Sequence, residues 1–267
     1  MEVCRKKPYN NIHIFNRRFP ASLEFRQIPQ DLSLGSGSSG PGHNFRGRHL
    51  DKKKEEMRFR NREEAGEKLA TALQKYKDTD AVVYAMPRGG VPLGEIAARR
   101  LNLPLDLVIV RKVAHPNDPE FAICAVAESG KKLCNEDAAY LDQAALDLLI
   151  KDQVAEAERR REVYLRGRRR ISPEGKTAII IDDGVATGLT MKLAIETIAA
   201  ARPKKIIAAA PIVPKDAYRE ISKSVDEFVV LEVPQAYLGA VGSYYDEFHQ
   251  LEDSEVTKLL KKHNDNI

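Results

Sequence analysis

Residues 178–190 read Ala-Ile-Ile-Ile-Asp-Asp-Gly-Val-Ala-Thr-Gly-Leu-Thr, and this stretch decides the expected fold. Its first four residues are apolar and mostly β-branched, which is typical of a strand buried on both faces. Two adjacent carboxylates, Asp182 and Asp183, follow the strand directly. A loop of small and hydroxyl residues comes next, and apolar residues at helical spacing then predict a helix that begins near Gly188.

The loop after the carboxylates has the chemistry of a phosphate-binding site. Gly184 and Gly188 allow backbone N–H groups to approach a ligand closely, and the start of the helix adds unpaired donors and a partial positive charge. Thr187 and Thr190 can add hydroxyl donors. The alternative is an ordinary turn between a strand and a helix, since Asp-Gly is a common turn signal. The expected phosphate-binding residues are Gly184, Val185, Ala186, Thr187, Gly188, Leu189 and Thr190.

The carboxylates complete a pattern that suits a phosphorylated sugar. Asp182 and Asp183 lie just beyond the carboxyl end of the strand, where open α/β sheets bind ligands, and they can accept hydrogen bonds from a diol. A phosphate on the loop and a diol on the acids describe a ribose 5-phosphate. The pattern resembles the phosphoribosyl diphosphate (PRPP) signature of type I phosphoribosyltransferases. That resemblance implies that the acid pair holds the ribose hydroxyls, meets Mg²⁺ only indirectly or through them, and precedes a loop that holds the 5-phosphate.

A second loop predicts a pyrophosphate site. Residues 81–86 read as a strand that runs into Pro87-Arg88-Gly89-Gly90 and then into a helix. The two glycines free the backbone, and Arg88 offers a cation for an anionic ligand. Alone, this pattern also fits a simple turn. Beside the acid pair, it resembles the pyrophosphate loop of the phosphoribosyltransferases.

A further basic pair follows the next apolar run. Residues 105–110 read as a buried strand that ends in Arg111 and Lys112, and a polar stretch with two prolines follows. This arrangement resembles orotate phosphoribosyltransferase and its relatives, which implies that the two cations meet pyrophosphate and that a flexible loop closes over the site. Lys112 is therefore expected to act in catalysis beside Asp182 and Asp183. The alternative is a solvated hairpin with Arg111 and Lys112 at its rim.

Alternating strands and helices predict the architecture. Residues 205–213 and 227–233 read as strands, and residues 214–222 read as the helix between them. This order predicts an α/β fold, in which a parallel sheet carries helices on both faces. The resemblance adds a type I phosphoribosyltransferase-like arrangement with a small hood or insertion. Residues 57–267 would form this domain.

A helical insertion is expected at about 135–167. Asn135 is a suitable N-cap for it. Its arginine clusters at 159–161 and 168–170 could contact nucleic acid, but interspersed glutamates favour a solvated helix face. Cys124 lies in an apolar run and the three cysteines show no CxxC spacing, so neither a disulfide framework nor a zinc site is expected.

The C-terminal region contains aromatic residues that could bind a flat acceptor. Tyr244 and Tyr245 lie in a glycine-bearing segment after the last predicted strand. They could line a pocket for an acceptor base, since an aromatic ring offers an apolar face for stacking. Packing of the C-terminal segment on the domain explains the same pattern equally well.

Residues 1–56 differ in composition from the rest of the chain. They carry 11 Lys/Arg against 6 Asp/Glu, whereas the whole chain of 267 residues has a net charge of +4. A Gly/Ser-rich run at 35–42 and a charge run at 51–56 predict a disordered basic extension, with Met57 as a candidate native start. The remainder is nearly neutral, so no nucleic-acid partner is expected. The lack of a secretory signal and of a membrane span predicts a cytoplasmic protein without a membrane partner.

Together these features predict transfer of a 5-phosphoribosyl group from PRPP to a nitrogenous acceptor, a nucleobase or a related compound. Pyrophosphate would be released, Mg²⁺ would be the cofactor, and a homodimer is compatible with the pattern. The alternatives are a non-catalytic PRPP-binding regulator and, less favoured, a nucleic-acid-binding protein. The expected pyrophosphate-binding residues are Arg88, Gly89, Gly90, Arg111 and Lys112.

Overall fold

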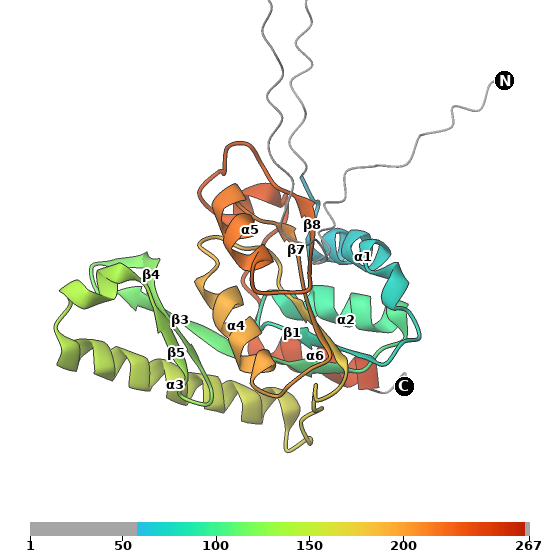
Figure 1. Ribbon diagram of the computed structural model, residues 1–267, viewed down its shortest axis with the longest axis horizontal. Helices are drawn as coiled ribbons and strands as arrows, with labels where there is room; N and C mark the ends of the chain where they lie inside the picture. Colours follow the sequence, from blue (N-terminus) through green and yellow to red (C-terminus); the bar gives the residue numbers. More distant parts are fainter. Residues whose placement is uncertain (1–57, 265–267) are drawn as a thin grey trace, which may run out of the picture. The chain divides into compact units, whose positions relative to one another are not determined.

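A five-stranded parallel sheet forms the centre of the region that the structure describes, residues 58–264 of a computed structural model (Figure 1). The strand order is β2-β1-β6-β7-β8, and every neighbouring pair is parallel. The predicted α/β class and its parallel sheet are therefore confirmed. The strands are β1 (Ala81–Ala85), β2 (Leu105–Leu107), β6 (Thr177–Ile181), β7 (Lys205–Ile212) and β8 (Glu227–Glu232).

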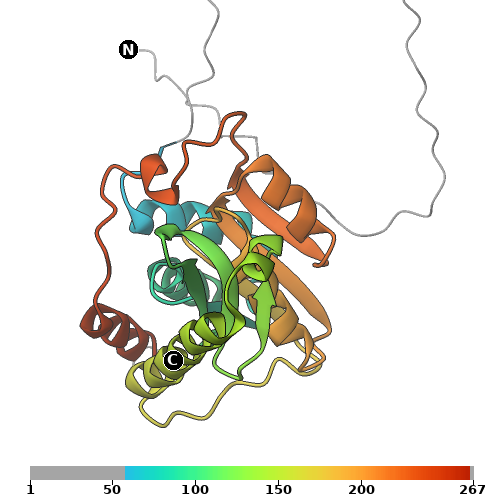
Figure 2. The ribbon, with the colours of Figure 1, turned by 90° about the vertical axis from the view of Figure 1, so that its left-hand side faces the viewer.

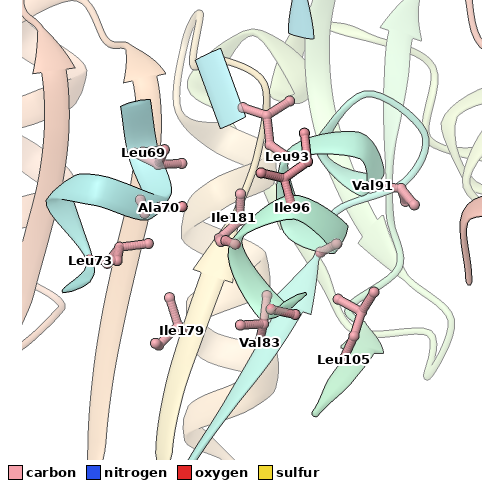
Figure 3. Packing of buried hydrophobic residues seen from close by; sticks show 14 of the residues in the cluster. Leu69, Ala70, Leu73, Val83, Val91, Leu93, Ile96, Leu105, Ile179 and Ile181 are labelled. Carbon is pink, nitrogen blue, oxygen red and sulfur yellow. The ribbon is translucent and has the colours of Figure 1, made fainter. Parts of the chain in front are cut away.

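Helices cover both faces of this sheet, so its strands carry apolar side chains on both sides. Ile179 and Ile181 of β6 pack in one buried cluster, whereas Ala178 and Ile180 pack in another, as the alternation of side chains along a strand requires. The first face is covered by α1 (Arg62–Ala72), α2 (Gly90–Leu101) and α6 (Asp253–Asn264). The second face is covered by α4 (Leu189–Ala199) and α5 (Lys215–Ser222). Figure 3 shows the first cluster, with side chains of α1 and α2 around Ile179 and Ile181.

A three-stranded antiparallel sheet and a long helix form a second substructure, which we call the hood (Figure 2). Its elements are β3 (Val110–His115), β4 (Asp118–Ala127), β5 (Lys132–Cys134) and α3 (Gln143–Leu165). The sheet and the helix share a small core that includes Val113, Ile123, Val126, Leu146 and Ile150. The predicted hood and helical insertion are therefore present.

The prediction of one strand at 105–110 is wrong. β2 ends at Leu107, and β3 begins at Val110 in the hood, so the chain changes sheet between them. The Leu107 carbonyl accepts a hydrogen bond from Arg161 of α3 at 2.7 Å, which ties the end of β2 to the hood. The polar stretch after Lys112 is the end of β3 and its turn into β4, as the hairpin alternative predicted. A continuous apolar run gives no sign of such a change of sheet.

The predicted helix start at Asn135 is also wrong. Residues Glu136–Tyr140 form a 3₁₀ turn, Leu141 is extended, and α3 begins only after Asp142. The Asp142 side chain caps α3 by accepting a hydrogen bond from the backbone N–H three residues later, at 2.8 Å. Asn and Asp are both good cap residues, so residue type alone could not separate the two positions. Two further 3₁₀ turns of the described region are Gln74–Tyr76 and Val241–Tyr244.

A disulfide joins Cys124 to Cys134, contrary to the prediction that no disulfide forms. The two residues lie directly opposite each other in the β4–β5 pairing, with Cα atoms 4.0 Å apart. Cys124 is buried in the hood core, as expected. The ten-residue separation is not a recognisable motif, and only the register of the hairpin brings the two thiols together.

Part of the sequence interpretation lies outside the described residues. This is the case for the basic extension at 1–56 and for the candidate start at Met57. Within residues 58–264, no helix is both long enough and apolar enough to cross a membrane.

Gly94→Ala tests the close packing of α2 on β1. A Cβ atom at Gly94 would lie 2.6 Å from the Cβ of Ala85, which is closer than real contacts allow. Alanine gains about 1 kcal/mol of helix propensity over glycine. We nevertheless expect a net loss of about 1–3 kcal/mol, because the helix must move off the strand. Urea unfolding measures the change, and a variant as stable as the wild type would contradict this packing.

Candidate active site

A cavity of about 490 Å³ lies where the carboxyl ends of β1 and β6 meet the start of β3. Its walls also include α1, α3, the first turn of α4 and the segment before α6. The sequence-predicted acid pair and basic residues thus share one cavity. The arginine, lysine and aspartate side chains that line it are Arg62, Arg88, Arg111, Lys112, Arg160, Asp182 and Asp183.

The acid pair, Asp182 and Asp183, directly follows β6, as predicted. The Asp183 N–H donates a hydrogen bond to Oδ1 of Asp182 at 2.9 Å. Burial raises the pKa of Asp182 well above its ordinary value, and the neighbouring charge of Asp183 raises it further. Burial also raises the pKa of Asp183, although the Arg62 guanidinium opposes this shift. Two carboxylates held in this way favour a ligand that donates hydrogen bonds, such as a diol.

Arg62 is a site residue that was not predicted from the sequence. From the first turn of α1, its Nε donates to Oδ2 of Asp183 at 2.8 Å, and its Nη1 donates to the carbonyl of His249 at 2.8 Å. Its guanidinium carbon lies 3.8 Å from the ring centre of Phe248, in a cation–π contact. Arg62 is only 9% exposed. It therefore connects the acid pair to the segment before α6, and no signal in its charged helix marks it as the inward-facing arginine.

Two glycines are needed where the β1–α2 loop approaches the acid pair. A Cβ atom at Gly89 would overlap the Asp183 carboxylate, and one at Gly90 would lie 2.5 Å from the Ile181 carbonyl oxygen. The Met86 N–H donates to that same carbonyl at 2.9 Å, which holds the loop against the end of β6. The predicted Gly-Gly pair therefore permits a close approach of two loops, in addition to forming a turn.

The loop predicted to bind phosphate has a buried part and an accessible part. Val185 is buried, and its N–H donates to the Ile212 carbonyl at 2.8 Å, so the fold uses this backbone donor. Ala186 and Thr187 are exposed. Gly188 has a φ of +85°, in the left-handed region that favours glycine. Within residues 58–264, no group accepts a hydrogen bond from the N–H of Ala186, Thr187 or Gly188, so all three donors can serve a ligand.

The ends of this loop connect it to the core and to the cavity. A Cβ atom at Gly184 would overlap the side chain of Val241, so this glycine also serves a close approach. Leu189 begins α4, and Thr190 in its first turn lines the cavity. Because the first N–H groups of a helix have no partner within it, the start of α4 adds donors beside the cavity.

Arginines from three elements line the cavity together: Arg88 of the β1–α2 loop, Arg111 of β3 and Arg160 of α3. Arg111 donates from Nε and Nη2 to Oε1 of Gln153, at 3.1 and 2.8 Å. Burial lowers the pKa of Arg111, and the charges of Arg160 and Arg88 lower it further. Lys112 is more exposed and lines the same cavity. The predicted basic residues are thus gathered at one place, together with an arginine from the insertion.

The prediction of a solvated face at 159–161 is wrong for two of these three arginines. Arg160 is only 6% exposed and pairs with Glu156 at 2.7 Å. Arg161 pairs with Glu128 at 2.6 Å and also reaches the end of β2. Consecutive residues of a helix point in directions about 100° apart. A helix that packs on both the hood sheet and the cavity therefore cannot present all three side chains to solvent.

The segment before α6, residues 246–252, forms the C-terminal wall of the cavity, and we call it the strap. Tyr244 and Tyr245, the predicted acceptor-pocket residues, are not among the described residues that line this cavity. Both are buried, and the Tyr245 hydroxyl donates to the Asp183 carbonyl at 2.7 Å. They pack the C-terminal segment on the domain, as the alternative interpretation predicted. The strap residues that line the cavity are Phe248, His249, Gln250 and Leu251.

Comparison with known families identifies the class of this chain. A family model described as the phosphoribosyl transferase domain matches residues 59–247. The matched region contains the acid pair, the β1–α2 loop and the hood. The chain belongs to the phosphoribosyl transferase domain family.

Relatives of this phosphoribosyl transferase domain have the same description. Two Mycobacterium tuberculosis proteins, from strains CDC 1551 and H37Rv and both named "Putative phosphoribosyl transferase", are 39% identical to it over 207 residues. The match covers 76% of this chain and 46% of each relative, so the chain spans about half the length of the curated relatives it matches. The crystal structure of TT1426 from Thermus thermophilus is 38% identical, with a TM-score of 0.64, and the match covers 77% of this chain and 99% of that chain.

Mg²⁺ fits this phosphoribosyl transferase site only together with substrate ligands. Within residues 58–264, no group of three or more His, Cys, Asp or Glu side chains could hold a metal ion. The acid pair supplies two carboxylates, and Oδ2 of Asp183 already accepts a hydrogen bond from Arg62. In proteins Mg²⁺ commonly keeps several waters and binds one or two carboxylates plus substrate phosphates. The donor set therefore agrees with the indirect role predicted for Asp182 and Asp183.

Arg62→Met should destabilise the protein by about 3–5 kcal/mol, because the truncation leaves Asp183 buried without its cation. Adding Asp183→Asn should recover part of this loss, since an amide needs no counter-charge. Urea unfolding of both single variants and the double variant measures the coupling. Arg60→Met, at an exposed arginine close by, is the control and should cost less than about 1 kcal/mol. Equal stability of the Arg62→Met and Arg60→Met variants would contradict the ion pair.

Glu156 should make the stability of the hood depend on pH. Hydrogen bonds from Arg159 and Arg160 lower the pKa of Glu156 from 4.5 to about 2. A carboxyl group with a lowered folded-state pKa contributes stability above its unfolded pKa and loses that contribution as the pH falls through the folded pKa. Glu156→Gln should therefore reduce the loss of stability between pH 4.5 and pH 2. Melting temperatures across this range measure the effect, and parallel profiles for variant and wild type would rule it out.

Proposed function

We propose that this domain transfers a 5-phosphoribosyl group from PRPP to a nitrogen atom of an acceptor and releases pyrophosphate. The observation that carries the proposal is that the acid pair lines the same cavity as Arg88, Arg111 and Lys112. Carboxylates suit ribose hydroxyls, and clustered cations suit a diphosphate. PRPP carries both groups on one molecule.

The acid pair would hold the ribose and stabilise its developing charge. As the bond between the anomeric carbon and pyrophosphate breaks, the sugar becomes positively charged in an oxocarbenium-like transition state. Carboxylates fixed on the ribose hydroxyls favour this state over the neutral sugar. The hydrogen bond from Arg62 to Asp183 would fix the orientation of that carboxylate without help from the substrate.

The loop at 184–190 would hold the 5-phosphate. The available N–H groups of Ala186, Thr187 and Gly188 and the start of α4 offer donors to an anion. The hydroxyls of Thr187 and Thr190 would add further hydrogen bonds. Anchoring the phosphate at one end of the sugar would leave the anomeric carbon between the acids and the cations.

The basic side of the cavity would take the pyrophosphate. Arg88, Arg111 and Lys112, with the backbone at Gly89 and Gly90, would neutralise the negative charge that builds up on the leaving group. Mg²⁺ bound to PRPP would supply Lewis-acid stabilisation of the same group. Closure of the cavity by the strap and the hood would keep water away from the reactive sugar.

The acceptor would be a nucleobase or a related nitrogen compound that enters beside the strap. Phe248 offers an apolar ring and Gln250 an amide at this wall of the cavity. Such groups suit a flat heterocycle with hydrogen-bonding edges. Cytoplasmic location and homodimer formation stay predictions from the sequence.

A PRPP-binding regulator without catalysis is the second candidate. One observation favours it: Asp183 already accepts a hydrogen bond from Arg62 at 2.8 Å. A carboxylate shared with a guanidinium stabilises a cationic sugar less than a carboxylate without such a partner. Nucleic-acid binding has less support, because Arg159 and Arg161 pair with acidic side chains of the domain itself.

Calorimetric titration with PRPP and Mg²⁺ tests the proposal. The wild type should bind PRPP, and the double variant Asp182→Asn/Asp183→Asn should bind at least about tenfold more weakly, because neutral amides replace both carboxylates. Asp216→Asn, at an exposed position on α5, is the matched control and should leave binding unchanged.

Unchanged binding by the double variant would remove the acid pair from the PRPP site, and no binding by the wild type would refute the proposal. If PRPP binds, pyrophosphate release should next be measured across a panel of nucleobases. Tight PRPP binding without pyrophosphate release on any of them would favour the regulator.

A further inference from the structure

Arg160 reaches the cavity from α3, the long helix of the hood. It is 6% exposed, and its Nε donates to Glu156 at 2.7 Å. Within residues 58–264, no group accepts a hydrogen bond from its two terminal nitrogens, although the residue lines the cavity. A buried guanidinium with unused donors at a cavity wall is costly unless an anion can bind there.

The residues around Arg160 concentrate positive charge. Arg111 lies close enough for its pKa to be lowered by burial and then by the charges of Arg160 and Arg88. The hydrogen bonds of Arg111 go to Gln153, a neutral side chain. These three arginines come from the β1–α2 loop, β3 and α3, so their proximity results from the tertiary fold and from no local sequence pattern.

The acidic side chains nearby offset only part of this charge. Asp253 lies 3.7 Å from Arg88, but it also accepts shorter hydrogen bonds from Arg159 at 2.8 Å and from the Tyr164 hydroxyl at 2.6 Å. Glu156 is shared in the same way between Arg159 and Arg160. The carboxylates thus hold the arginines in position and leave a positive surface on the cavity side.

We propose that Arg88, Arg111 and Arg160 together form a subsite for a diphosphate group, so that the hood helix α3 is part of the substrate site. The fork of a guanidinium matches pairs of phosphate oxygens, and a diphosphate has enough oxygens to meet three forks at once. A monophosphate offers too few oxygens to engage all three. The inference rests on the proposed function, in which this diphosphate is that of PRPP.

Titration with inorganic pyrophosphate, in parallel with inorganic phosphate, tests the subsite without any acceptor. The wild type should bind pyrophosphate more tightly than phosphate. Arg160→Gln should weaken pyrophosphate binding by about tenfold to a hundredfold, since it removes charge-assisted hydrogen bonds. Arg160→Lys keeps the charge without the fork and should lose less. Arg169→Gln removes the same charge at an exposed position beyond α3 and should bind like the wild type.

Melting temperatures of the variants separate binding from folding. If Arg160→Gln fails to fold, Arg160→Lys carries the test, and its pyrophosphate affinity should lie measurably below that of the wild type. Pyrophosphate affinity equal to that of Arg169→Gln, in a folded Arg160 variant, would overturn the inference.

The same experiment separates this inference from the proposed function. If pyrophosphate binds through Arg160 but PRPP binds no better than pyrophosphate, the subsite stands and the transferase proposal fails. If PRPP binds well and Arg160→Gln has no effect on either ligand, the subsite is wrong and the transferase proposal stands.

Discussion

The parallel pairing of β1 with β6 is the constraint on which the site depends. Ala85 pairs with Ile181 in register, so the segments that follow the two strands emerge side by side at one end of the sheet. Gly89 then permits contact with Asp183, where any larger residue would displace the carboxylate. Because the two loops touch, cations that follow β1 and carboxylates that follow β6 face one cavity.

Charge is buried at this site on both sides of the cavity. The acid pair is desolvated and held by Arg62, while Arg111 and Arg160 are desolvated beside each other. Burying ionised groups costs several kcal/mol per ion unless partners compensate. A fold that keeps both clusters, separated by a cavity, suits a ligand with a diol at one end and several anionic oxygens at the other. Phosphoribosyl diphosphate is such a ligand.

The sequence predicted those features that depend on local order along the chain. β6, the acid pair and the loop after it are contiguous, so their chemistry could be read directly. Arg62 and Arg160 could not be found in this way, because a helical pattern shows that an arginine lies on a helix but not which element it faces. The Cys124–Cys134 disulfide and the change of sheet after Leu107 likewise depend on strand register, which forms only when distant segments pair.

The crystal structure of the protein with PRPP and Mg²⁺ tests the central claim most directly, since that claim concerns where one ligand lies. The account predicts the ribose hydroxyls within hydrogen-bond distance of Asp182 and Asp183. It also predicts the 5-phosphate on the loop at 184–190 and the diphosphate among Arg88, Arg111 and Arg160. A ligand bound with its phosphates away from both the loop and the arginines, or with its ribose away from the acid pair, would contradict it.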